Sequence, residues 1–165
     1  MKHVPLILLG VALMFAGCGK SSEQKAVEEN LNAEVLKLHE KQMLELNEIR
    51  DLMSGIDIEL SDHDRLAAAH PKEFAGRSPD DLIVAKKVLM AAKSAMDTWM
   101  SSYRMYDPRM KHEDAIAKLT KDRDDLFKIQ AAFDSAKGAA TAALDAHRAF
   151  VHQIAAIPPA NRPKN

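Results

Sequence analysis

Methionine and histidine are the residue types in this chain best suited to chemistry. Thioether and imidazole groups are ligands that copper favours. His39 and Met43 are four residues apart, as are Met96 and Met100, so each pair would share one face of a helix. These residues belong to a larger set that follows position 18: Met43, Met53, Met90, Met96, Met100, Met105, Met110, His39, His63, His70, His112, His147 and His152. The set suggests soft-metal binding as one function, although methionine also fills gaps in helical cores. No tight ligand motif is present in the sequence, so we assign no residue as a metal ligand.

Motifs that would indicate catalysis are missing from the sequence. It contains no glycine-rich phosphate loop and no Gly-x-Ser-x-Gly, and His39-Glu40 is followed by Met43 where a zinc protease would have its second histidine. The acidic pair Asp80-Asp81 suits a helix start, and the two side chains would point about 100° apart on a helix. We therefore expect no enzyme activity, no catalytic residues and no cofactor.

Cys18 is the only cysteine. It follows a short basic start and an apolar run, Val4 to Ala16, which is too short for a membrane span of about 20 residues. The run ends in Phe15-Ala16-Gly17-Cys18, which resembles the lipobox of bacterial lipoproteins. The resemblance implies a signal peptide over residues 1–17, cleavage before Cys18, and acyl chains such as palmitate on that cysteine. Gly19, in place of an aspartate retention signal, indicates the periplasmic face of the outer membrane.

The net charge of the chain limits the kinds of molecule that it is expected to bind. Lysine and arginine total 23 against 24 acidic residues, which gives a net charge of −1. Such a chain has no basic footprint for nucleic acid. We expect the membrane to be contacted through lipid on Cys18, and an envelope protein or a second copy of the chain to be the protein partner.

Helical signals fill the mature chain. After a polar tether over residues 18–25, we expect residues 26–157 to form the folded domain and residues 158–165 to form a disordered tail. The first helix is expected from about Gln24 to Ser54, with Gly55 as its C-cap. Residues 55–77 contain turn signals and a short helix that ends at Pro71. A second helix has Ser78 as N-cap and Pro79 as its first residue, and runs to about Tyr106. A third begins at Pro108 or His112 and ends near Ala156.

Three long amphipathic helices must bury their apolar stripes against one another. The expected fold is therefore all-α, an antiparallel three-helix bundle with coiled-coil-like packing. Trp99 and Tyr103 are expected at the bulky end of its core, with an exposed aromatic patch as the alternative. His147 falls on a core seam, whereas His63 and His70 are expected in a solvated loop. The third helix, at about 45 residues, is expected to be the longest, and it could project, bend near Gly138 or pair with a second chain.

Two segments carry a further resemblance. Residues 33–40 with Met43 and residues 48–53, and then Ala95-Met96-Asp97-Thr98-Trp99-Met100 through Tyr103, resemble the first two helices of small helical lipoproteins from Bacteroidetes-like bacteria. Those proteins are sometimes labelled as viral A-type inclusion protein repeats. The resemblance implies fold and location, and no binding residues.

Together these features predict a membrane-anchored periplasmic lipoprotein that acts as a helical interaction or scaffold module. The alternative is a periplasmic soft-metal protein that binds or sequesters copper. A third hypothesis is attachment to peptidoglycan through Lys164, although such lipoproteins usually end in lysine and this chain ends in Asn165.

Overall fold

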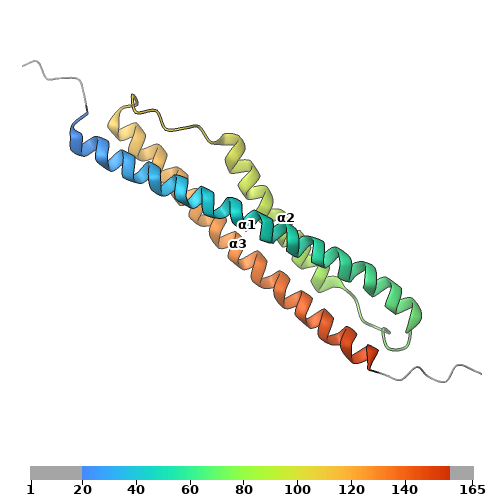
Figure 1. Cartoon of the computed structure of the whole chain (residues 1–165). Helices are drawn as coiled ribbons and strands as arrows, with labels where there is room; N and C mark the ends of the chain where they lie inside the picture. The colour runs from blue at the N-terminus through green and yellow to red at the C-terminus, as the bar shows by residue number, and fades with distance from the viewer. Residues whose placement is uncertain (1–19, 157–165) are drawn as a thin grey trace, which may run out of the picture.

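The computed structural model describes residues 20–156, and these form three helices: α1 (Ser22–Ala69), α2 (Asp80–Ser102) and α3 (His112–Ala155). Helices α1 and α3 lie side by side and run in the same direction, and α2 runs back between their ends (Figure 1). The predicted all-α three-helix bundle is confirmed. No helix in residues 20–156 is long and apolar enough to cross a membrane.

Helix α1 begins earlier than its apolar pattern indicates. Ser21 is the N-cap: its hydroxyl accepts from the Gln24 backbone N–H at 3.1 Å, and the Gln24 side chain accepts from the Ser21 N–H at 3.0 Å. This capping box satisfies two backbone N–H groups at the helix start. The predicted tether over residues 18–25 is therefore wrong from Ser22 onward.

The predicted end of the first helix at Gly55 is also wrong. Helix α1 continues to Ala69, where the His70 N–H bonds to the Leu66 carbonyl and Pro71 prevents continuation. Ile56 directly follows Gly55 and is fully buried. Burial of this kind offsets the cost of glycine in a helix, about 1 kcal/mol relative to alanine.

A seven-residue repeat explains the packing of the two long helices. Their buried positions recur every seventh residue: in α1 these are Glu28, Val35, Gln42, Ile49, Ile56 and His63, and in α3 Leu119, Leu126, Phe133 and Ala140. A seven-residue period is the signature of coiled-coil packing. It extends through Gly55 without interruption, which is why one helix forms there.

Helix α2 covers only the middle of this pair. Its buried face follows the predicted seam: Leu82, Ala85, Leu89, Ala92, Met96 and Trp99. Its N-cap is Pro79 and not Ser78, one residue from the prediction. It ends at Ser102 and not near Tyr106, and the hydroxyls of Ser101 and Ser102 bond back to the carbonyls of Thr98 and Trp99. Helix α3 begins at His112, the later of the two predicted starts.

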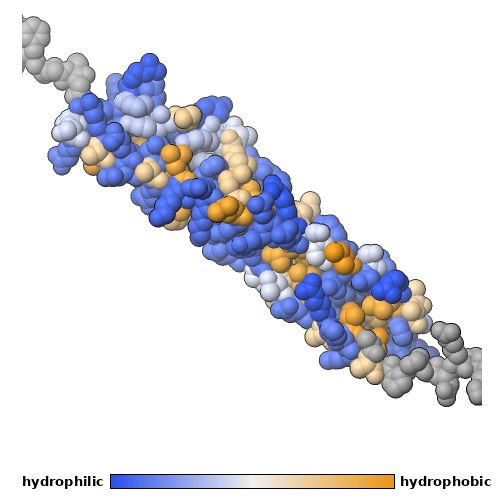
Figure 2. Space-filling model, in the orientation of Figure 1, coloured by the Kyte–Doolittle hydropathy of each residue, from blue (hydrophilic) through white to orange (hydrophobic). Residues whose placement is uncertain are grey.

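Most of the surface on the side seen in Figure 2 is hydrophilic, with apolar side chains scattered along the rod. Among the glycines in residues 20–156, only Gly76, in the turn between α1 and α2, has a positive φ, +74°, which favours glycine there. Phe74 in the same turn is buried and closes the bundle at this end.

Candidate functional site

A fully buried glutamate lies at the end of the bundle where α1 begins. Glu28 accepts from Lys20 Nζ at 2.5 Å and from the Tyr106 hydroxyl, and its Oε1 is 2.8 Å from His112 Nδ1. Lys20 precedes α1, Tyr106 lies in the α2–α3 loop (residues 103–111), and His112 opens α3. We call these four residues the Glu28 clamp, because one carboxylate joins three separate segments.

The electrostatics of the Glu28 clamp favour a charged carboxylate. Burial raises the pKa of Glu28, but the hydrogen bonds from Lys20, Tyr106 and His112 outweigh burial and lower that pKa to about 2. Burial and the bond to Glu28 raise the pKa of Tyr106 to about 12. Tyr106 therefore stays a donor and Glu28 an acceptor across the neutral range. A buried charge with this many donors orders the chain around it.

Polar side chains also join α1 to α3 in the middle of the bundle. Gln42 Nε2 donates to the Leu126 carbonyl at 2.6 Å, and Glu45 accepts from Lys137 Nζ at 2.7 Å and from Gln130 Nε2 at 3.0 Å. Burial raises the pKa of Glu45, but the bonds from Lys137 and Gln130 give a net lowering. Such partners fix the register of two helices.

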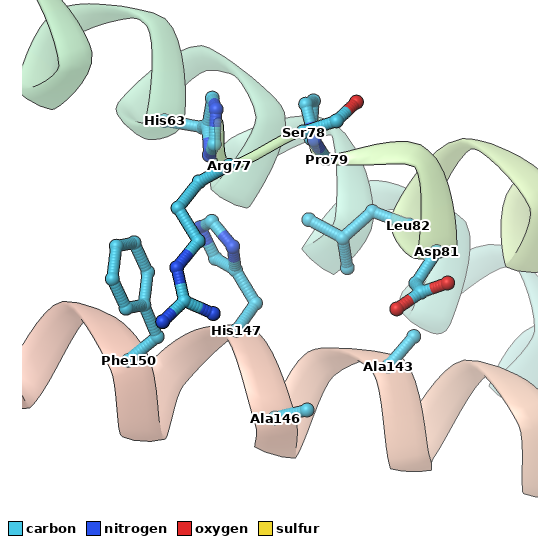
Figure 3. A pocket seen from close by; sticks show the side chains of 10 residues that line it. All are labelled: His63, Arg77, Ser78, Pro79, Asp81, Leu82, Ala143, Ala146, His147 and Phe150. Carbon is cyan, nitrogen blue, oxygen red and sulfur yellow. The ribbon is translucent and has the colours of Figure 1, made fainter. Parts of the chain in front are cut away.

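Two histidines face each other at the opposite end. His63 of α1 and His147 of α3 have ring centroids 5.3 Å apart, and the rings of His63 and Phe74 are nearly perpendicular with centroids 5.1 Å apart. Both rings line a cavity of about 150 Å³, which we call the histidine pocket (Figure 3). Its rim carries Arg77, whose guanidinium lies 4.9 Å from the centre of the Phe150 ring.

The histidine pocket offers imidazole groups to a small ligand. His63 Nδ1 and His147 Nε2 are buried and have no hydrogen-bond partner within the protein. The nearest carboxylate oxygen to His147 Nε2 belongs to Glu59, at 3.8 Å, and Glu59 bonds to Arg148 instead at 2.8 Å. Burial lowers the pKa of His147, and His63 adds to that lowering while Glu59 opposes it. Near neutral pH the His147 ring is therefore uncharged, with one lone pair and one N–H.

The structure separates most of the residues that suggested a metal site. Met96 is fully buried in the core, while Met43, Met90 and Met105 are exposed. His39 packs on Trp99, with ring centroids 5.5 Å apart. Within residues 20–156, no group of three or more His, Cys, Asp or Glu side chains is arranged to hold a metal ion. Cys18 lies outside the described residues.

Predictions for the aromatic and histidine residues had mixed outcomes. Trp99 is buried at 7% exposure and stacks on half-buried Tyr103 at 4.6 Å, which confirms its place in the core. The seam position of His147 is confirmed, with its side chain 8% exposed. The prediction for His63 was wrong: it lies buried within α1 because that helix does not stop at Gly55. Glu28 was missed, although the seven-residue repeat runs back to it.

Comparisons with known proteins give no relative. No family model matches the chain, and no curated protein or solved structure matches it.

Proposed function

We propose that this protein is a periplasmic lipoprotein, held at the inner leaflet of the outer membrane by acyl chains on Cys18, and that it acts as a helical interaction module. Support for the anchor comes from the apolar run and the Ala16-Gly17-Cys18 motif. Three acyl chains, at about 0.8 kcal/mol per buried CH₂, would make membrane attachment effectively permanent. The module binds an envelope protein and has no catalytic role.

An apolar groove between α2 and α3 is the observation that carries the interaction part of the proposal. Val84 and Val88 are 57% and 38% exposed on α2. They adjoin a row of alanines on α3, and the α2–α3 groove is lined by Asp81, Val84, Ala85, Val88, Ala139, Ala142, Ala143 and Ala146. Single exposed apolar residues are ordinary, whereas a contiguous apolar groove marks a contact surface. Alanine side chains would let a partner helix approach closely.

Site-specific crosslinking in cells tests this function. A photoreactive amino acid at Val84 should give a discrete adduct with one envelope protein, and Ala142→Glu should abolish that adduct by placing a charge in the groove. Ile58 on α1 is the matched control, because it is an aliphatic residue of similar exposure, 61%, outside the groove. Equal labelling from Val84 and Ile58 would contradict a specific surface.

The anchor is tested separately. Cys18→Ser should move the protein from the membrane fraction to the soluble periplasmic fraction. Mass spectrometry of the amino-terminal peptide should show an acylated cysteine in the parent protein. An unmodified cysteine in membranes of the native host would contradict the anchor.

A second candidate function, copper sequestration, is favoured by the facing His63 and His147. Two imidazole nitrogens suit two-coordinate Cu(I), whereas structural Zn(II) sites need four ligands. Native mass spectrometry of residues 19–165 should then show one Cu(I) adduct and no Zn(II) adduct. His63→Gln should remove the adduct and His70→Gln should keep it. A metal-free spectrum with Cu(I) would contradict this function.

A further inference from the structure

We infer that the histidine pocket binds a small zwitterion, a free amino acid of about the size of alanine, with its carboxylate at Arg77 and its ammonium group at Asp81. This ligand goes beyond the interaction module and does not depend on the lipid anchor. It takes the place that Cu(I) would take between His63 and His147, so the two ligands are alternatives at one pocket. The inference is carried by opposite charges at the two ends of the pocket and by two buried nitrogens without partners.

Arg77 and Asp81 lie at opposite ends of the histidine pocket (Figure 3). The guanidinium of Arg77 lies 4.9 Å from the centre of the Phe150 ring. Asp81 lies on the other side of Leu82, close to Ala143. Ala143 precedes Phe150 by about two turns of α3, which corresponds to about 10 Å. A charge-assisted hydrogen bond is about 2.8 Å long, so a molecule whose two charges are a few ångströms apart can reach both ends of the pocket.

The remaining charges around the pocket are paired or offset. Two acids of α1 pair with arginines: Glu59 with Arg148 at 2.8 Å, and Asp62 with Arg65 at 3.0 Å. Arg77 and Asp81 form no ion pair within residues 20–156. The positive end of the α2 dipole, about half a unit charge, is exceeded by the acids in the first turn of that helix. An anion would be attracted by Arg77 and repelled by Asp81, and a cation would meet the reverse, whereas a zwitterion is attracted at both ends.

Both histidines present a nitrogen to this pocket that needs a partner. His63 is 6% exposed, and the His147 side chain is 8% exposed. His63 Nδ1 and His147 Nε2 have no hydrogen bond to any group in the described part of the chain. Buried polar atoms in folded proteins nearly always have a partner. A ring nitrogen of a neutral imidazole donates or accepts according to its tautomer, so these atoms can donate to the carboxylate of the ligand and accept from its ammonium group.

The size of the pocket limits the side chain of the ligand. Its volume is about 150 Å³. An apolar cavity of about this volume in another protein holds benzene, which has about as many heavy atoms as alanine. Leu82, Ala143 and Ala146 provide an apolar wall against which a methyl group can pack. We therefore expect alanine to fit and an amino acid with a large aromatic side chain to be excluded.

Isothermal titration calorimetry of the full chain in detergent tests the inference, with L-alanine as the probe. Alanine should bind at a single site. Acetate carries only the carboxylate and ethylamine only the ammonium group, so each should bind at least about tenfold more weakly, because one charge-assisted contact is missing. L-Phenylalanine should not bind, because its ring exceeds the volume of the pocket.

Two pairs of variants locate the contacts. Arg77→Gln and Asp81→Asn should each weaken alanine binding about tenfold or more. The control for Arg77 is Arg104→Gln, at an exposed arginine near the other end of the bundle. The control for Asp81 is Asp80→Asn, at the neighbouring acid in the same helical turn, which does not line the pocket. Both controls should leave the affinity unchanged. All four side chains are exposed, so the variants should fold, and circular dichroism checks this.

Nitrogen NMR of the histidine rings tests the buried contacts. Alanine should shift the ring-nitrogen signals of His63 and His147 and leave those of exposed His152 in place. Signals of His63 and His147 that do not respond to saturating alanine would overturn the assignment of the ligand to this pocket.

The calorimetric outcomes distinguish the inference from the proposed functions. Acetate that binds as tightly as alanine, or an Asp80→Asn variant as weak as Asp81→Asn, would overturn the zwitterion. A chain that binds Cu(I) and not alanine would overturn the inference in favour of copper. The lipid anchor and the crosslinking at Val84 have separate readouts, so they can stand or fail independently of alanine binding.

Discussion

Glu28 Oε1 lies 2.8 Å from His112 Nδ1, and the 84 residues between them along the chain also separate His63 from His147 at the other end of the bundle. The same offset joins Gln42 to Leu126 at mid-length. Helices α1 and α3 therefore keep one parallel register over five heptads, and each of these three layers contains a polar side chain. A shift of register would break all of these contacts together, which is how a few buried polar groups specify an alignment that apolar residues alone leave degenerate.

Removing the carboxylate of Glu28 should be strongly destabilising. Glu28→Ala leaves Lys20, Tyr106 and His112 without their shared acceptor, and breaking a buried ionic group in this way costs about 3 kcal/mol. Urea unfolding of residues 19–165 measures the loss. Glu29→Ala, at the exposed neighbouring position, should change the unfolding free energy by less than about 0.5 kcal/mol. Equal effects from the two substitutions would contradict a role for the clamp in stability.

Acid should weaken the same end of the bundle. The pKa of Glu28 falls from 4.5 to about 2 on folding, so the unfolded chain binds the proton more readily. The stabilisation is complete above 4.5 and is lost as the pH falls towards about 2. Unfolding free energy plotted against pH should therefore slope downward in this window, and Glu28→Gln should flatten the slope. An unchanged slope would assign the acid sensitivity to other carboxylates.

The histidine pocket should make the folded protein less stable at a higher pH than the Glu28 clamp does. Because the pKa of His147 is below 6.5 in the folded protein, the unfolded chain takes up the proton first and stability declines as the pH falls below 6.5. The acidic residues around His147 are Glu59 and Asp62 of α1 and Asp81 of α2. The basic residues around it are His63, Arg77 and Arg148. His147→Gln should remove the decline, whereas substituting exposed His152 should not. Hydrogen exchange of residues 60–75 would show whether the loss starts at this end.

Much of the fold followed from the sequence, and the candidate sites did not. The burial of Trp99 was predicted because apolar spacing is local, and His112 was one of the two predicted starts of α3. The end of α1 was predicted wrongly at Gly55 because glycine is a common C-cap. Only the packing of α1 against α3 shows that the helix continues past this residue. Glu28 was not singled out from the sequence. Its burial depends on donors as far as 84 residues away, although the seven-residue spacing to Val35 was visible.

Glycines within the helices should be replaceable with a gain in stability. A Cβ at Gly55 would meet Leu144 Cδ1 at 3.8 Å, an ordinary contact, and a Cβ at Gly138 would meet nothing within 4 Å. Gly55→Ala and Gly138→Ala should each raise the unfolding free energy by about 1 kcal/mol. Gly76→Ala should lower it by about 1 kcal/mol, because φ +74° strains any residue with a Cβ. Thermal unfolding of the three variants compares them directly, and stabilisation by Gly76→Ala would contradict that turn geometry.

Gln42 should contribute more to register than to stability. Its Nε2 donates to the Leu126 carbonyl at 2.6 Å, but its buried Oε1 has no partner in the protein. Gln42→Leu removes that buried unpaired oxygen and adds apolar contact, so the unfolding free energy should stay the same or rise. The cost should appear in the specificity of alignment. Cysteines introduced at Glu34 and Arg123, whose charged groups lie 3.7 Å apart, can be joined by a short thiol-reactive crosslinker, and this crosslink should become less selective against neighbouring positions. Val35→Leu, one heptad earlier, is the control. A variant that loses stability and keeps its selectivity would assign Gln42 a role in stability and none in alignment.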